Sequence, residues 1–375
     1  KLDPDASWWK KKQVARIKNI TVKNLLKEKL ESASVEYARK LGVIQNSLYG
    51  VDIQPIAAEI SKLRCFLSLI VDENIDENKA NRGIEPLPNL EFKFVTADTL
   101  IALPQQNYSN HYTDQVEELE ELRNDYIQSF GKKKTILKDK FLKIHQKIAE
   151  KQNNLFSDKE SKTYQVSSWN PFNHEKSNWF DPKWMFGVEK FDIIIGNPPY
   201  IKEYINKAAF NEIRGKKYYQ GKMDIWYYFA CYLFDFLTSN GNLTFIATNN
   251  WTTNTGASKL RDKITTDCTV IQFVDFGNTK IFSSADIQTM ILIAENYNKS
   301  DIYEFSHKRI IDNSANLKDA INMLNNISNE KYLISTQNFD RGYLSGKTFS
   351  FNSSKYEKLL ELIKSKKNFT LDSKK

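Results

Sequence analysis

The tetrapeptide Asn197-Pro198-Pro199-Tyr200 contains the residue types that point most directly to chemistry. Two adjacent prolines remove two backbone N–H donors and fix two φ angles, so neither a helix nor a strand can continue through them. Asn197 carries an amide oxygen, the Pro198 carbonyl is held between two rings, and Tyr200 presents an aromatic face. The segment therefore predicts a rigid polar site at the end of a strand.

These groups suit the methylation of an aromatic amine such as the exocyclic nitrogen of adenine. The lone pair of that nitrogen is delocalised into the ring, which makes it a poor nucleophile. The Asn197 amide oxygen and the Pro198 carbonyl can each accept one amino hydrogen and stabilise the developing positive charge. Tyr200 supplies a face on which an extruded base stacks, at about 1–3 kcal/mol per base. The structural alternative is a proline-stopped strand followed by a core tyrosine.

The segments around this tetrapeptide predict the elements that position it. The aliphatic run Ile193-Ile194-Ile195 predicts a strand buried on both faces, as in parallel sheets. Upstream, one short strand ends on Asp52 and a second ends on Ala97-Asp98. Between them, a helix that begins near Pro55 has one apolar face, formed by Ile56, Ile60, Leu63, Leu67 and Ile70.

Downstream, a helix rich in aromatic residues leads to an expected turn at Asn240-Gly241 and a strand from Leu243 to Ala247. Two further strands are expected in "VIQFVDFG" and "DIQTMILIAENY". Because strands and helices alternate, the pattern predicts an α/β fold with a doubly wound sheet.

Ligands of such sheets bind outside the carboxyl ends of the strands, where Asp52, Asp98 and the tetrapeptide are all expected. The carboxylate of Asp52 can accept both hydroxyl hydrogens of a ribose, and Asp98 can accept a hydrogen bond from a nucleobase amino group. Taken singly, each aspartate is also typical of a helix N-cap or a turn.

The chain of 375 residues is long enough for one large or two medium domains, and its hydrophobic fraction of 41% is ordinary for a globular protein. The net charge of +8 is compatible with a polyanionic partner. The three cysteines are widely spaced, which indicates a reduced cytoplasmic protein without a structural metal. No apolar run approaches the ~20 residues that a membrane helix requires, so no membrane partner is expected. The chain begins with lysine rather than methionine, and an excised fragment is expected.

Residues 114–151 differ in character from their surroundings. The arm before Gly131 is acidic and the arm after it is rich in lysine, with apolar residues at helical spacing in both. Folded back on itself, this segment predicts an inserted helical hairpin over about residues 112–155, with opposite charges flanking the seam. Contact of the lysine arm with phosphate is the alternative.

Several segments together resemble one known family. They are "YGVDIQPIAAEISKLRCFLSL", "FDIIIGNPPYI", "MDIWYYFACYLFDFLTSNGNLTFIATNNW" and "FGNTKIFSSADIQTMILIAEN". Over about residues 45–300 the chain resembles the amino-methylating, gamma-order DNA adenine methyltransferases, specifically the large Eco57I-like methylases of fused type II restriction–modification enzymes. The resemblance implies a Rossmann-like class I methyltransferase fold, S-adenosylmethionine as methyl donor, and a bacterial or archaeal cytoplasmic protein.

The resemblance also implies roles for individual residues. Asp52 corresponds to the residue that binds the ribose of S-adenosylmethionine, Ile53 lines its adenine, and Asp98 contacts that adenine. The catalytic motif for a flipped adenine in double-stranded DNA corresponds to Asn197, Pro198 and Tyr200, with Pro199 as a rigid spacer. Residues expected near the target base are Asp224, Trp226, Asn250 and Trp251. For Trp226, core packing is the alternative.

The glycine-rich loop of the family, Asp-Pro-x-x-Gly-x-Gly, does not occur in this sequence, whose first glycine is Gly42. The loop is expected upstream of residue 1, so the fragment by itself is expected to bind S-adenosylmethionine weakly or not at all and to be inactive. A target-recognition domain, which would read the recognition sequence, is expected after residue 375. A nuclease, if fused before residue 1, would bring Mg²⁺.

The expected organisation is a helical lead-in over residues 1–48, a catalytic domain over 49–300, and a linker over 301–375. Two other functions share these sequence features. The same tetrapeptide occurs in methyltransferases that act on a glutamine amide of translation release factors, and a DNA-binding module without activity is also compatible with the missing loop. Candidates for a second stacking ring on the target base are Phe339, Tyr343 and Phe349.

Overall fold

The computed structural model describes residues 7–15, 35–72, 77–78, 82, 89–104, 113–127, 129, 131–152, 161–283, 287–297, 300–349, 351 and 362–363. The chain divides into two compact units, Lys1–Glu189 (unit 1) and Lys190–Lys375 (unit 2). Among the described residues, no helix is both long and apolar enough to cross a membrane. The same residues contain no cluster of side chains that could hold a metal ion.

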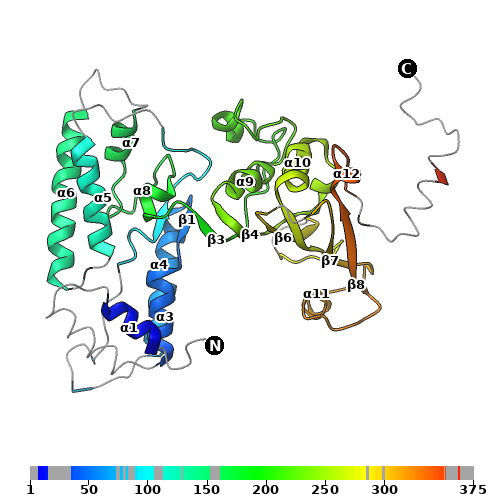
Figure 1. Ribbon diagram of the computed structural model, residues 1–375, viewed down its shortest axis with the longest axis horizontal. Coiled ribbons are helices and arrows are strands. Elements are labelled where there is room, and N and C mark those ends of the chain that lie inside the picture. The colour runs from blue at the N-terminus through cyan, green and yellow to red at the C-terminus, as the bar shows by residue number, and fades with distance from the viewer. Residues whose placement is uncertain are drawn as a thin grey trace. The chain divides into compact units, whose positions relative to one another are not determined.

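Unit 1 consists mainly of helices around one short parallel pair of strands (Figure 1). Its elements are α1 (Ser7–Ala15), α3 (Val35–Asn46), β1 (Gly50–Asp52), α4 (Pro55–Ile70), β2 (Phe94–Thr96), α5 (Thr113–Ile127), α6 (Lys132–Gln152), α7 (Lys162–Ser168) and α8 (Pro182–Phe186). β1 and β2 pair in parallel, with Asp52 opposite Thr96. Of the predicted helical lead-in over residues 1–48, residues 1–6 and 16–34 lie outside the described residues.

Helix α4 begins where the sequence predicts, with Pro55 in its first turn, where the missing N–H donor costs nothing. The predicted apolar face, however, is not buried within the described structure. It consists largely of exposed side chains: Ile56 (63%), Ile60 (47%), Leu63 (53%) and Leu67 (51%). The buried residues of the helix are instead Ala58 and Leu69.

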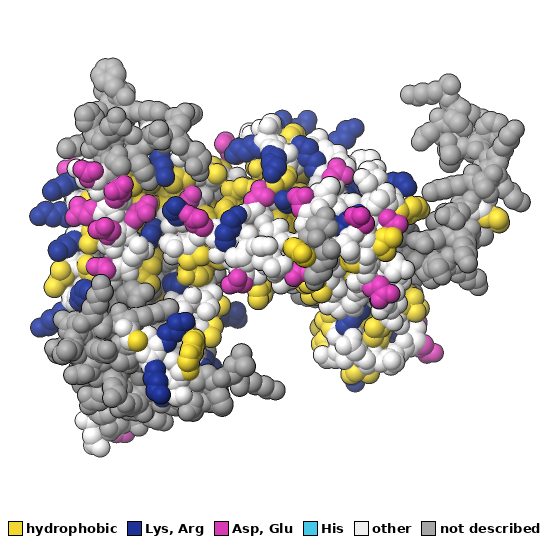
Figure 2. Space-filling model, in the orientation of Figure 1, with side chains coloured by type: hydrophobic (Ala, Val, Ile, Leu, Met, Phe, Trp, Pro, Cys, Tyr) yellow, Lys and Arg dark blue, Asp and Glu magenta, His cyan; other side chains and the backbone are white. Residues whose placement is uncertain are grey.

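Helices α5 and α6 form the helical hairpin expected between residues 112 and 155. Gly131 lies between them in a left-handed conformation, with φ of +55°, which favours glycine. The seam is apolar and includes buried Val116, Leu119, Leu137 and Phe141. Acidic and basic side chains lie next to each other over the two helices (Figure 2). Tyr112, Gln128, Phe130 and residues 153–155, which belong to this prediction, lie outside the described residues.

Unit 2 is built on a six-stranded mixed sheet in the order β3-β4-β6-β5-β7-β8 (Figure 1). Its strands are β3 (Phe191–Gly196), β4 (Leu237–Thr248), β5 (Thr269–Asp275), β6 (Thr289–Glu295), β7 (Ile302–Ile310) and β8 (Tyr332–Asp340). Its α-helices are α9 (Ile225–Phe234), α10 (Ser258–Asp267), α11 (Leu317–Leu324) and α12 (Arg341–Leu344), and its 3₁₀ helices are η2 (Ala208–Ile213), η3 (Asn249–Thr252) and η4 (Thr255–Ala257). Helix α9 packs on β4, α10 on β5, and α11 on β7 and β8. The predicted α/β class is confirmed.

The assignment of residues 301–375 to a linker is wrong for most of the described part of that range. Strand β7 pairs in parallel with β5, and β8 pairs antiparallel to β7, so both strands belong to the sheet of unit 2. β7 contains the polar run Ser306–Arg309, and its pairing with β5 and β8 makes it a strand. Residues 352–361 and 364–375 lie outside the described residues.

Strand β3 does not have the burial that its aliphatic run predicts. It lies at the end of the strand order and pairs with β4 alone among the described strands. Ile193 and Ile195, which share one face, are 62% and 77% exposed. A strand with one partner leaves one edge and part of one face uncovered, so the prediction of burial on both faces is wrong for unit 2 as described.

The turn predicted at Asn240-Gly241 is an irregularity within a strand rather than a helix-to-strand connection. β4 begins already at Leu237, and its register with β3 shifts between Phe191 and Ile193. Asn240 has a positive φ of 67°, and Gly241 accepts a hydrogen bond from the Asn296 backbone N–H at 2.7 Å. The local turn signal therefore marks a bulge.

Candidate active site

The tetrapeptide follows β3 directly, as predicted, and Gly196 is required there by close packing. Gly196 lies opposite Phe245 of β4, and a Cβ at position 196 would lie 2.9 Å from the Cε1 atom of that ring. A side chain at this position would require the Phe245 ring to move. Beyond it, Asn197 is exposed and Pro198 is buried. The strand end therefore holds the Asn197 amide at the surface on a proline-stiffened backbone.

Tyr200 links this segment to the sheet by a hydrogen bond to β4. Its hydroxyl donates a hydrogen bond to the Ile246 carbonyl at 2.8 Å and also contacts the Asn197 amide oxygen. Burial, and then the neighbouring Asp224 carboxylate, raise the pKa of Tyr200 to about 12, so the phenol keeps its proton at neutral pH. Because a phenol has one proton, the two acceptor oxygens share it, and Tyr200 thereby fixes where the Asn197 side chain lies.

Asp224 is the most deeply buried ionisable group near the tetrapeptide, at 2% exposure. It precedes α9 and forms an isolated antiparallel bridge with Lys202, and the adjacent Ile225 N–H donates to the Ile201 carbonyl at 2.9 Å. Burial raises the pKa of Asp224 to about 6. The backbone amide of Trp226 lies near enough to offset part of this shift, but neither carboxylate oxygen forms a full hydrogen bond with the described residues.

This burial predicts an unusual pH dependence of stability. An unfolded aspartate titrates near pH ~3.9, below the folded value of about 6, so in that interval the folded chain binds more protons than the unfolded chain. Stability therefore falls as the pH rises from about 4 to about 6. We expect Asp224→Asn to remove this slope, so the wild type loses about 1–3 kcal/mol relative to the variant across the interval.

Urea unfolding at pH values from 4 to 7, followed by tryptophan fluorescence, measures this difference. Asp262→Asn, at an exposed position on α10, is the matched control and should leave the wild-type profile unchanged. Parallel pH profiles for the wild type and Asp224→Asn would show that the carboxylate ionises normally in the folded protein.

The end of β4 and the start of α9 are joined by a chain of hydrogen bonds. The Trp226 indole N–H donates to the Thr248 hydroxyl at 2.9 Å, and that hydroxyl donates to the Asn250 amide oxygen at 3.1 Å. The Tyr227 hydroxyl donates to the same oxygen at 2.8 Å. With its oxygen occupied by two donors, Asn250 has only its amide N–H groups left for a ligand.

The four residues expected near a target base are thus placed differently. Trp226 and Trp251 are completely buried, with ring centroids 6.5 Å apart, so neither ring offers surface to a substrate in this structure. Asp224 is buried as well, and Asn250 is partly exposed. The expectation of direct substrate contact stays with Asn250, whereas the two tryptophans pack the region beneath it.

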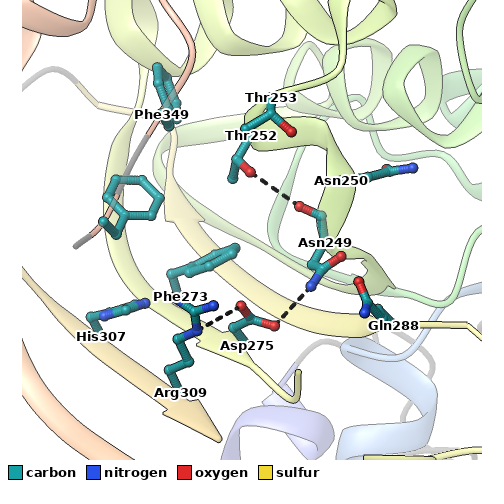
Figure 3. A pocket seen from close by; sticks show the side chains of 11 residues that line it. Asn249, Asn250, Thr252, Thr253, Phe273, Asp275, Gln288, His307, Arg309 and Phe349 are labelled. Carbon is teal, nitrogen blue, oxygen red and sulfur yellow. Dashed lines mark hydrogen bonds and ion pairs between the residues drawn. The ribbon is translucent and has the colours of Figure 1, made fainter. Parts of the chain in front are cut away.

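A cavity of about 330 Å³ opens beside Asn250 at the strand ends of unit 2 (Figure 3). Asp275, His307 and Arg309 line it, and the sequence analysis assigned a role to none of them. A signal for Asp275 was available, because it ends a predicted strand as Asp52 does. Arg309 and His307 lie in β7, which was assigned to a linker, so no sequence signal placed them at a site. Of the candidates for a second stacking ring, Phe349 lines this cavity, and Phe339 is fully buried.

In unit 1, Asp52 and Asp98 lie at the carboxyl ends of the paired strands β1 and β2, as predicted. One carboxylate oxygen of Asp52 accepts a hydrogen bond from the Gln54 N–H at 2.8 Å, and the residue is exposed. Ile53 beside it is 52% exposed. An exposed carboxylate next to an exposed aliphatic side chain fits a ribose and an adenine ring.

Both carboxylate oxygens of Asp98 have interaction partners, in contrast to Asp52. One of its oxygens accepts from the Leu100 N–H at 3.2 Å, and the other lies 3.7 Å from the Lys176 ammonium group. Both aspartates therefore also perform the turn-capping role that was the alternative for each. Among the described residues, Asp52 has one carboxylate oxygen without a hydrogen-bond partner, and this oxygen is available to bind a ligand.

Comparison with known proteins identifies relatives of this chain. The family model described as Eco57I restriction-modification methylase matches residues 46–282. A putative type II restriction enzyme and methyltransferase, RM.MjaORFECS2P of Methanocaldococcus jannaschii, is 28% identical over 332 residues, covering 72% of this chain and 27% of that protein. Type II methyltransferase M.XhoI of Xanthomonas vasicola is 33% identical over 97 residues, 25% of this chain and 18% of that protein. The chain thus spans about a quarter or less of the length of these relatives.

Among solved structures, the Type IIL restriction-modification enzyme MmeI, determined in complex with DNA, is similar with a TM-score of 0.36 and 13% identity, over 90% of this chain and 38% of that chain. The resemblance stated from the sequence, together with the methyltransferase fold class that it implies, is confirmed by the family model. Because the family model matches well over half of its residues, this chain belongs to the Eco57I restriction-modification methylase family.

Proposed function

We propose that the protein transfers a methyl group from S-adenosylmethionine to the exocyclic amino group of adenine in double-stranded DNA, as part of a restriction–modification or phage-defence enzyme. The observation that carries this proposal is the exposed Asn197 amide at the end of β3, followed by the rigid Pro198-Pro199 backbone and held by Tyr200. Family membership supports the reaction class.

In this proposal the protein groups bind and polarise the acceptor amine. The Asn197 amide oxygen and the Pro198 carbonyl accept the two amino hydrogens and stabilise the positive charge that develops on nitrogen. The Tyr200 ring stacks against the extruded base. S-adenosylmethionine supplies an electrophilic methyl group, so a C–N bond forms as a C–S bond breaks. The methylated nitrogen then loses a proton to water, and no strong general base is needed.

The cofactor contacts that we propose lie in unit 1. Asp52 would accept hydrogen bonds from the ribose hydroxyl groups, and Ile53 would contact the adenine ring. Asp98 would accept from the adenine amino group once its contact with Lys176 rearranges. We further propose that base-edge contacts to the recognition sequence come from a target-recognition domain of the full-length protein.

A methyl-transfer assay with radiolabelled S-adenosylmethionine tests the proposal. The full-length protein receives plasmid DNA or a translation release factor as the acceptor, and label is expected on adenine of the DNA alone. Label on the release factor alone would instead support the glutamine methyltransferase alternative. DNA binding without label on either acceptor would support a DNA-binding module without activity.

The Tyr200 hydroxyl and ring make separable contributions. Tyr200→Phe keeps the stacking face and removes the hydrogen bond to Ile246, so we expect methyl transfer to slow by about 2- to 10-fold, the equivalent of about 0.5–1.5 kcal/mol. Tyr200→Ala also removes the ring and should cost a further ~1–3 kcal/mol. Steady-state kcat and KM on plasmid DNA measure both effects. Equal losses in the two variants would mean that the ring does not stack on the base.

A further inference from the structure

The cavity of unit 2 lies on the same edge of the sheet as Asn197 but is built by other strands. Parallel pairing of β3 with β4 places the end of β3 at the end of β4. The same edge continues across β6, β5 and β7. The pairings that show this are Thr248 with Thr289, Asp275 with Met290, and Asp275 with Arg309. No residue of the Asn197–Tyr200 tetrapeptide lines the cavity. It is therefore a site apart from the methyl acceptor groups.

Aromatic rings form one side of the cavity. The ring of Phe351 lies 5.4 Å from that of Phe273 and 5.8 Å from that of Phe349, centroid to centroid. His307 stacks on Phe273 at 5.8 Å with an interplanar angle of 10°. The backbone N–H of Phe349 donates to the Thr252 carbonyl at 2.8 Å, which holds Phe349 against the chain that follows β4. The ring contacts among Phe273, His307 and Phe351 thus form an aromatic wall on one side of the cavity.

The charges that line the cavity compensate one another (Figure 3). One oxygen of the Asp275 carboxylate accepts from the Asn249 amide N–H and the Gly277 backbone N–H, each at 2.9 Å. The other oxygen lies 3.6 Å from the Arg309 Nε atom. Burial lowers the pKa of His307 to about 4, so its imidazole is neutral at neutral pH. A cavity without net charge does not select an anion such as free phosphate.

The polar groups left for a ligand are amides. In the described structure, the Asn249 amide oxygen has no hydrogen-bond donor, and the Asn250 amide nitrogen has no acceptor. An asparagine amide oxygen can accept a hydrogen bond from an amino group on the edge of a nucleobase, as in the contacts by which asparagine reads adenine. The volume of about 330 Å³ falls in the range of ~300–1,000 Å³ typical of pockets for small organic rings.

We propose that this cavity receives an unpaired nucleobase of the DNA substrate other than the adenine that is methylated. The base would stack on Phe351, the partly exposed ring of the cavity, with its polar edge toward the amide oxygen of Asn249. Arg309, which is 47% exposed, lies in the cavity lining beside the Asp275 carboxylate. The inference rests on the proposed function, since it takes DNA to be the substrate.

A single-stranded trinucleotide with 2-aminopurine between two thymidines is a suitable probe, because the fluorescence of 2-aminopurine falls when it stacks on an aromatic ring. The trinucleotide is titrated with the wild-type chain and with Phe351→Leu, which keeps apolar volume but loses the aromatic face. We expect Phe351→Leu to weaken binding by about 5- to 100-fold, as for the loss of one stacking ring. Phe351→Tyr, which keeps the ring, should retain wild-type binding and so exclude misfolding as the cause.

Two matched variants separate this cavity from other aromatic positions. Tyr343→Leu removes an exposed ring of unit 2 that does not line the cavity, and its binding should stay within about twofold of the wild type. Tyr200→Leu should leave the Phe351-dependent quenching in place. Quenching that disappears in Tyr200→Leu and persists in Phe351→Leu would overturn the inference but leave the proposed function intact. Phe351-dependent quenching, combined with a full-length protein that labels no DNA, would instead refute the proposed methyl transfer and leave binding of a base in the cavity intact.

Discussion

Replacing Asn197 with alanine is expected to lower the rate of methyl transfer by about 10²–10³-fold, the usual effect of removing one group that stabilises charge in a transition state. Asn197 is exposed, and its amide oxygen is held by contact with the Tyr200 hydroxyl. Its loss removes one of two acceptors for the amino hydrogens but no packing. Initial rates on plasmid DNA and an electrophoretic mobility shift assay with duplex DNA measure transfer and binding separately.

The loss should be confined to the chemical step, so duplex binding should change by no more than a few-fold. Asn338→Ala is the matched control, because Asn338 is exposed on β8 of the same sheet and should tolerate alanine with unchanged rate. Methyl transfer that survives in Asn197→Ala at more than a tenth of the wild-type rate would refute the role of the amide.

Replacing Gly256 with alanine is expected to have the largest effect on folding. A Cβ at this position would lie 2.1 Å from the Lys222 carbonyl oxygen and 2.8 Å from the Met223 Cα atom. Both are backbone atoms, which cannot rotate away as the end of a side chain can. Overpacking of a well-packed interior typically costs about 1–3 kcal/mol, and this backbone clash should reach or exceed the upper end of that range.

The same substitution should also impair catalysis, because Lys222 and Met223 lead directly into Asp224, whose neighbour Ile225 is bonded to the chain after the tetrapeptide. Urea unfolding and methyl-transfer rates would test the two effects together. Gly342→Ala is the control, since its added Cβ would lie 3.5 Å from the nearest atom, an ordinary contact. Equal stability of the Gly256→Ala and Gly342→Ala proteins would mean that the approach of the two backbones is looser than described.

Some features of the fold follow from local sequence alone. Pro55 and the apolar spacing after it give the start and length of α4, and the two prolines after Asn197 give the end of β3. These are consequences of φ restriction and missing donors, which act within a few residues and need no tertiary partner. The hairpin of α5 and α6 is likewise predicted by local features, the helical spacing of its apolar residues and the glycine at position 131.

Other predictions depended on neighbours that the sequence does not specify. Ile193 and Ile195 have the composition of a strand covered on both sides, yet their exposure depends on which strands and helices lie against β3. The polar strand β7 becomes part of the sheet only through its pairing with β5. Burial and strand pairing are long-range properties, and periodicity within one segment does not determine them.

The candidate site also has features that the sequence predicts and features that depend on the fold. The sequence by itself determined the tetrapeptide and its chemistry, the two carboxylates at strand ends, and the family, because each depends on residue types at short spacing. Only the tertiary structure decided that Trp226, Trp251 and Asp224 are buried. It also decided that Asn249, Arg309 and Phe351 meet in one cavity, since residues so far apart in the chain are brought together by the order of the strands.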